Sequence, residues 1–137
     1  MNRLKRPRED AWPFQAELHF PKGLLGFEHY TRYVLIGHQQ EKPFLRLEVE
    51  SRAFSFFVID PFLEHVDYTP TLTQQDLQDL DVLHEAKLFM LSIVNTNEHP
   101  YTMNLAAPLL IHWAGRLGKQ LLFPEDNAYP LVSILDT

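Results

Sequence analysis

Alternation of polar and apolar residues marks two segments of the chain, residues 15–20 and 44–50. In the first segment, Ala16, Leu18 and Phe20 fall on one side of an extended strand, and the polar residues fall on the other side. A period of two is typical of a strand with one buried and one solvated face. Both segments are therefore predicted to be strands with one wet face.

Further short apolar runs are rich in Phe, Val and Ile and are too short for helices. They lie at residues 33–36, 54–59, 88–94, 109–113, 120–123 and 131–135. Turn-forming residues separate most of them, for example at Asp60-Pro61, residues 115–118 and residues 124–127. We predict an all-β fold, a small antiparallel β-barrel or roll of about eight strands, because closing a sheet removes edges that would aggregate.

One segment has a helical pattern instead. Thr73 and Asp76 stand at capping-box spacing, so the Thr73 hydroxyl is placed to accept a backbone N–H in the first turn. Leu77, Leu80 and Leu83 follow at intervals of three, which gives a short helix an apolar stripe to rest on the sheet. We predict one short helix near residues 74–83.

The length of the chain and the charges of its first residues predict the domain organisation. The 137 residues fit one domain with a real hydrophobic core, which we place at residues 13–137. The first ten residues hold four basic and two acidic side chains, and we expect residues 1–12 to form a flexible basic arm.

The sequence shows no membrane-spanning segment, no secretory signal and no cysteine. The longest apolar run, residues 105–111, contains a proline and is far shorter than the roughly 20 residues that span a bilayer. No apolar segment follows the basic start, as a secretory signal would require. The sequence has no cysteine, which fits a reducing compartment. We expect a cytoplasmic protein with no membrane partner.

The net charge of −6 limits the partners. Nucleic-acid binding depends on Lys and Arg that neutralise phosphates, so an acidic body argues against a direct nucleic-acid partner and favours a basic protein. The segment 60–85 has no Lys or Arg and holds seven acidic residues: Asp60, Glu64, Asp67, Asp76, Asp79, Asp81 and Glu85. A charge run of this kind usually just faces water. Phe62 and Tyr68, however, lie beside Glu64 and Asp67, and rings next to steering charges are typical of a protein-docking surface.

No catalytic, cofactor or metal pattern is present. Gly23 and Gly26 lack the further glycine of a dinucleotide loop and the Gly-Lys-Ser/Thr of a phosphate loop, so we interpret them as a structural turn with positive φ. No two histidines have the i, i+4 spacing of a helical zinc pair. No serine lies in a nucleophile elbow. We expect no enzyme activity, no cofactor and no bound metal.

The sequence resembles the FliW family of flagellar assembly factors over residues 14–135. Four stretches carry the resemblance: FPKGLLGFE at 20–28, FSFFVIDP at 54–61, Asp67-Tyr68, and NLAAPLLI at 104–111. The first is similar to the family's F-x-x-G-L-P-G-F-E, with Leu25 in place of the usual proline. By this resemblance, Gly23, Leu24, Gly26 and Phe27 form a structural turn.

The resemblance implies a non-enzymatic regulator. FliW-like proteins bind CsrA, a dimeric RNA-binding repressor of flagellin translation, and antagonise it, with flagellin as the alternate partner. We expect this chain to do the same as a monomer. The predicted partner-binding residues are Phe62, Glu64, Asp67, Tyr68, Asn104 and Leu105. Two alternatives stay open: residues 104–108 are only core and turn, or the chain is a small β-barrel that binds a ligand or single-stranded nucleic acid.

Overall fold

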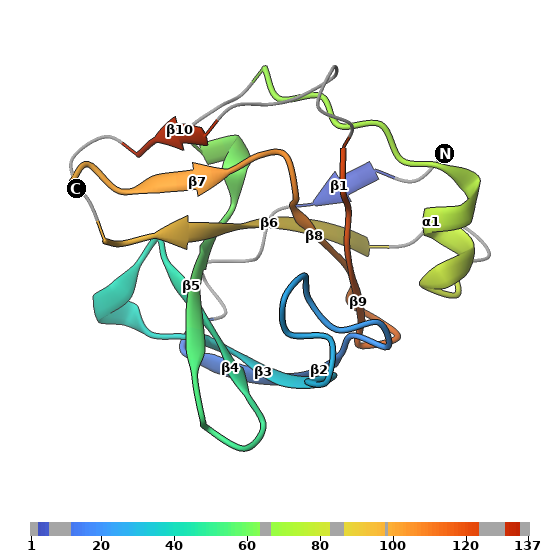
Figure 1. Ribbon diagram of the computed structural model, residues 1–137, viewed down its shortest axis with the longest axis horizontal. Helices are drawn as coiled ribbons and strands as arrows, with labels where there is room; N and C mark the ends of the chain where they lie inside the picture. Colours follow the sequence, from blue (N-terminus) through green and yellow to red (C-terminus); the bar gives the residue numbers. More distant parts are fainter. Residues whose placement is uncertain are drawn as a thin grey trace.

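The computed structural model describes residues 3–5, 12–63, 67–82, 87–97, 99–123 and 131–134 (Figure 1). The strands are β1 (Arg3–Lys5), β2 (Phe14–His19), β3 (Arg32–Gly37), β4 (Leu45–Val49), β5 (Ser55–Ile59), β6 (Lys87–Asn95), β7 (Thr102–Asn104), β8 (Leu109–His112), β9 (Leu117–Gln120) and β10 (Leu131–Ser133). Two 3-10 helices, η2 (Gln39–Glu41) and η3 (Pro61–Leu63), and one α-helix, α1 (Gln74–Asp79), complete the described elements.

Seven strands close into a barrel. The order of hydrogen-bonded neighbours is β6-β5-β4-β3-β2-β9-β8, and β8 pairs again with β6. The joint between β2 and β9 is narrow, because only His19 and Leu117 are paired there. The predicted all-β barrel with one short helix is confirmed.

Strand β6 joins the barrel to the rest of the sheet. It pairs in parallel with β1, and in antiparallel fashion with β5, β7 and β8. Its residues Leu88 to Val94 are buried or nearly so on both faces. A strand buried on both faces shows a continuous apolar run, which explains why this segment has no alternating pattern.

Apolar side chains form two cores, one on each side of β6. The inner core fills the barrel and includes Leu35, Leu47, Phe89 and Leu91. The outer core lies on the other side of β6, where Met90 clusters with buried residues that come both before and after β6 in the sequence. The members of the outer core are Ile59, Tyr68, Leu80, Val82, Leu88, Met90, Val94, Met103, Leu105, Leu110, Leu121 and Ile134.

Strands β2, β3 and β4 have one face in the inner core and one face outside the barrel. Buried residues alternate with more exposed ones along all three strands. The wet faces predicted for residues 15–20 and 44–50 are therefore confirmed.

The helix begins as the sequence predicts. The Asp76 N–H donates to Thr73 Oγ1 at 3.0 Å, and the Thr73 N–H donates to Asp76 Oδ2 at 2.9 Å, which completes the capping box. The helix ends at Asp79, and Leu80 is the fully buried C-cap residue. Residue 83, the predicted end, lies outside the described residues. No helix within the described ranges has the length and apolar composition needed to cross a bilayer.

The strand predicted at 120–123 was misplaced, since β9 occupies Leu117–Gln120. Its apolar signal is missing because Gly118 faces the core where the Phe20 ring fills the space: a Cβ on Gly118 would lie 2.4 Å from Phe20 Cε2. The three-residue strands β1 and β7 had no recognisable pattern. Within the predicted N-terminal arm, Arg3–Lys5 pairs with β6 and the Trp12 side chain is buried in the inner core.

Candidate functional site

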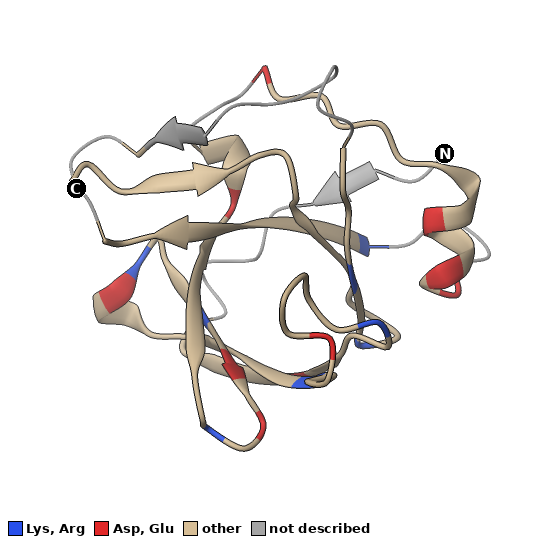
Figure 2. Ribbon diagram, in the orientation of Figure 1, with Lys and Arg blue, Asp and Glu red and all other residues tan. Residues whose placement is uncertain are grey.

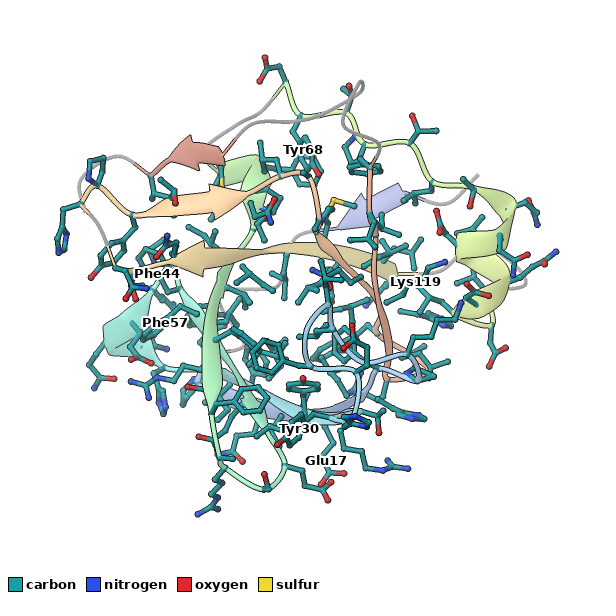
Figure 3. All side chains as sticks on the ribbon, viewed as in Figure 1. Glu17, Tyr30, Phe44, Phe57, Tyr68 and Lys119 are labelled. Carbon is teal, nitrogen blue, oxygen red and sulfur yellow. The ribbon has the colours of Figure 1, made fainter. Side chains whose placement is uncertain are left out.

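Two of the predicted partner-binding residues, Tyr68 and Leu105, meet in a buried hydrogen bond. The Tyr68 hydroxyl donates to the Leu105 carbonyl oxygen at 2.6 Å, although the two residues are 37 positions apart. Tyr68 is 3% exposed and Leu105 is 0% exposed, so both belong to the outer core. Figure 3 shows Tyr68 near the strands β7 and β8. The side chains of Tyr68 and Leu105 therefore lie beneath a surface and do not form it.

Phe62, which lies in η3, packs against the ring of Tyr68. The two ring centroids are 5.7 Å apart with an interplanar angle of 38°. The Phe62 N–H donates to Asp60 Oδ1 at 2.9 Å, which fixes the start of η3. Phe62 is half-buried and Asp67 is exposed, so both residues are accessible on the predicted partner surface. Glu64, the remaining acidic member, lies outside the described residues.

Asn104 closes a turn at the end of β7. Its Oδ1 accepts a hydrogen bond from the Ala106 N–H at 2.9 Å, and its side chain is half-buried. A side-chain oxygen bonded two residues ahead is an Asx turn. Residues 104–108 therefore have the core-and-turn structure that the sequence left open as one alternative.

The acidic segment is partly neutralised by a lysine that the sequence analysis did not use. Lys119 Nζ lies 2.8 Å from Asp76 Oδ1 and 2.6 Å from Asp79 Oδ2, and Lys22 Nζ lies 3.4 Å from Asp79 Oδ2. Figure 2 shows the acidic positions of α1 close to the basic position of β9. Asp60 is also buried. The segment 60–85 is thus less negative at its surface than its composition indicates.

The pKa shifts in this network follow from its contacts. The hydrogen bond from Lys119, with a second from Gln75, lowers the pKa of Asp79 from 3.8 to about 2. Burial alone would raise the pKa of Asp76, but hydrogen bonds from Lys119 and Thr73 outweigh it and lower the pKa below 3.8. Burial would lower the pKa of Lys119, but its bonds to both carboxylates raise it above 10.5. All three groups are therefore charged at neutral pH.

The glycine loop covers one end of the barrel. Gly23 and Gly26 have φ angles of 65° and 85°, and Leu24 is buried in the inner core. The Phe27 ring centroid lies 4.8 Å from that of Phe54. Leu25, between Leu24 and Phe27 in the loop, is 64% exposed. The loop is thus held by Leu24 and Phe27.

One polar contact of this loop reaches strand β9, and another lies within the loop. The Leu25 N–H donates to Gln120 Oε1 at 2.7 Å, and Gln120 Nε2 donates to the Ala107 carbonyl oxygen at 3.1 Å. Gln120 therefore joins the glycine loop to the turn after β7. The Gly26 N–H donates to Glu28 Oε2 at 2.9 Å, and this bond lowers the pKa of Glu28.

Metal chemistry has no support in the part of the chain that the structure describes. There, no group of three or more His, Asp or Glu side chains converges in a way that could hold a metal ion.

The chain is similar to known proteins of one family. Residues 8–134 match the family described as FliW protein. The chain is 34% identical over 114 residues to the "Flagellar assembly factor FliW" of Borreliella afzelii, covering 81% of this chain and 86% of that protein. It is 37% identical over 112 residues to the protein of the same name from Natranaerobius thermophilus, covering 78% and 74% of the two chains.

A solved structure has the same fold. The crystal structure of the flagellar assembly factor FliW superimposes with a TM-score of 0.77 at 27% identity, and the match covers 85% of this chain and 84% of that chain. The sequence motifs, the closed barrel and these matches agree. The chain belongs to the FliW protein family.

Proposed function

We propose that this chain is a flagellar assembly factor that binds the translational repressor CsrA and antagonises it, and that flagellin is its alternate partner. When flagellin is exported, the freed chain captures CsrA, and flagellin synthesis resumes. The observation that carries the proposal is membership of the FliW family over residues 8–134. The role is regulatory, without catalysis or a cofactor, and it belongs in the cytoplasm, where translation takes place.

The charge of the chain supports this choice of partner. A net charge of −6 suits a basic RNA-binding protein and repels RNA itself. Exposed Asp67 precedes Tyr68 in the sequence, and half-buried Phe62 packs on the Tyr68 ring, so a charge and a ring are both positioned by Tyr68. We propose that Phe62, Glu64, Asp67 and Asn104 contribute to the partner face, with Tyr68 and Leu105 holding it in place.

The test is a calorimetric titration of the purified chain with CsrA from the same organism, repeated after saturation with flagellin. We expect sub-micromolar binding that flagellin abolishes, and no shift of RNA in a low-salt mobility assay. Heat exchange with neither protein would refute the proposal. Sedimentation of the free chain is expected to give a monomer.

A charge reversal locates the partner face. Asp67→Lys is expected to weaken CsrA binding at least about fivefold and to reduce its salt dependence, because a steering charge is inverted. Asp81→Lys is the matched control, since it makes the same change of charge at another exposed acid of the segment. Equal affinities for the two folded variants would remove Asp67 from the interface.

A further inference from the structure

The turn from Asn104 to Pro108, which belongs to the proposed partner face, is held by hydrogen bonds from outside the turn. The carbonyl oxygens of residues 105–108 accept from four donors: Tyr68 Oη, Phe123 N, Gln120 Nε2 and Leu121 N. Leu121 and Phe123 donate from the backbone, and Tyr68 lies in the outer core. Gln120 differs from these three, because its side chain also contacts the glycine loop. The turn is therefore tied through Gln120 to a much earlier segment of the chain.

The two contacts of the Gln120 side chain fix which way its amide group points. Its Oε1 accepts from the Leu25 N–H at 2.7 Å, and its Nε2 donates to the Ala107 carbonyl oxygen at 3.1 Å. A backbone N–H can only donate and a carbonyl oxygen can only accept. Rotation of the amide by 180° would therefore set donor against donor and acceptor against acceptor. The glycine loop thus selects the amide orientation in which Gln120 supports the turn.

The donor in the glycine loop depends on the residue at position 25. The family motif has proline at this position, and proline has no N–H to donate. Leu25 supplies an N–H, while its side chain is 64% exposed. Figure 1 shows the loop between β2 and β3 beside β9, the strand that ends at Gln120. The backbone of Leu25, and not its side chain, therefore ties the loop to Gln120.

Loss of the Gln120 donor would change the position of the turn. Ala107 is 7% exposed, so its carbonyl oxygen has little access to water, and a buried acceptor that loses its donor is costly. The backbone would move to find another donor. Asn104 would move with it, because Asn104 Oδ1 accepts from the Ala106 N–H at 2.9 Å within the same turn. A change at the Ala107 carbonyl is thus passed to the side chain proposed to contact the partner.

We propose that Gln120 is a positioning residue of the partner face. Its amide, oriented by the Leu25 N–H, holds the Ala107 carbonyl oxygen and so keeps Asn104 where the partner contacts it. Gln120 acts through the turn and not through a contact of its own with the partner. The glycine loop contributes to binding in the same indirect way. The inference deepens the proposed function and rests on it, since the partner is CsrA.

The first experiment tests the link between the loop and the turn without CsrA. Leu25→Pro removes the N–H, and Leu25→Ala is the matched control, because it shortens the same exposed side chain and keeps the N–H. Nuclear magnetic resonance spectra of the labelled variants are compared with wild type. We expect Leu25→Pro to shift the side-chain amide signals of Gln120 and the backbone amide signals of Ala106 and Ala107, and Leu25→Ala to leave them in place. Equal shifts in the two variants, or none in either, would overturn the inference.

The second experiment separates position from charge. Gln120→Glu keeps an acceptor for the Leu25 N–H but replaces the donor to the Ala107 carbonyl oxygen by a second acceptor. Gln74→Glu makes the same change at an exposed position of α1. Added negative charge alone would favour a basic partner. We expect Gln120→Glu nevertheless to weaken CsrA binding about fivefold, the effect of one hydrogen bond, and Gln74→Glu to leave it within about twofold. Equal affinities of the two variants would overturn the inference.

The titrations are made at a temperature at which circular dichroism shows each variant to be fully folded. A purely structural role of Gln120 would lower the melting temperature and leave the dissociation constant of the folded chain unchanged, and this result would overturn the inference. Leu25→Pro is titrated beside Leu25→Ala, so that the comparison does not depend on the folding of Gln120→Glu, and Leu25→Pro is expected to bind about threefold more weakly.

The outcomes for the inference and for the proposed function differ. If CsrA binds the wild-type chain and all folded variants equally, the inference fails and the proposed function stands. If CsrA does not bind the wild-type chain, the proposed function fails, and the resonance comparison of Leu25→Pro with Leu25→Ala alone decides the inference.

Discussion

Replacing Lys119 by Met removes the cation that holds α1 on the barrel while keeping the side-chain volume. Lys119 and Asp76 are mostly buried, with side chains 18% and 13% exposed, and their charged atoms are 2.8 Å apart. A hydrogen bond to a charged group contributes about 1.5–3 kcal/mol when it is buried. Because some solvent reaches this pair, we expect its loss to cost about 1–2 kcal/mol. For a chain of this size the melting temperature falls by about 3–8 °C.

The pH dependence of this loss has a definite sign. The pKa of Asp79 is lowered to about 2 in the folded state, so its ion pair stabilises the fold above the ordinary value of 3.8 and is lost as the pH falls through about 2. The pKa of Lys119 is raised, so its contribution is present below 10.5 and is lost as the pH rises through the folded value. The difference in melting temperature between wild type and variant is therefore expected to be constant from about pH 5 to pH 9 and to shrink below about pH 4.

The assay is thermal unfolding followed by circular dichroism across this pH range. Lys22→Met is the matched control, since it makes the same substitution at a lysine that is 78% exposed and 3.4 Å from Asp79 Oδ2. Exposed pairs contribute little, so this variant should melt within about 1 °C of wild type. A Lys119→Met variant that melts like the control, or whose difference from wild type is the same at pH 2 and pH 7, would refute the electrostatic reasoning.

Two further predictions concern the free energy of unfolding, measured with urea. Gly23→Ala is expected to lower it by about 2–4 kcal/mol, because a Cβ at this positive φ would lie 2.7 Å from the Glu28 Cα. Gly26→Ala, at a positive φ with nothing within 4 Å, should lower it by only about 1 kcal/mol, and equal losses would contradict the steric explanation. Tyr68→Phe removes the hydroxyl that donates to the Leu105 carbonyl oxygen and leaves that buried acceptor without this bond. The free energy of unfolding is therefore expected to fall by about 1–2 kcal/mol. An unchanged urea midpoint would show that the bond adds no net stability.

Local patterns in the sequence predicted the parts of the fold that depend on local physics. The capping box needs only residues three positions apart, and Thr73 and Asp76 formed it as expected. Alternation predicted the wet faces of β2 and β4 because each strand is buried on one side only. Strand β9 was misplaced because its key position is a glycine that makes room for Phe20, a residue almost 100 positions away in the chain.

The candidate site was harder to predict because its contacts join distant parts of the chain. Composition showed that residues 60–85 are acidic, but it could not show that Lys119 neutralises Asp76 and Asp79. The Tyr68 ring was expected at the surface, and only the fold shows that it lies beneath Phe62 in the outer core. A lone lysine in a strand and a tyrosine beside an aspartate give no sequence signal for such pairings.

The late position of β6, β8 and β9 in the chain determines when the newly made chain can close its barrel. Strands β2 to β5 are sequence neighbours and can pair in turn as they leave the ribosome, but their inner face has no complete opposite wall until β6, β8 and β9 follow. At about 5–20 residues per second, synthesis of the chain from the end of β5 to the end of β9 takes about 3–12 s. During those seconds the apolar inner face of a four-stranded sheet is open to water, and aggregation competes with closure of the barrel.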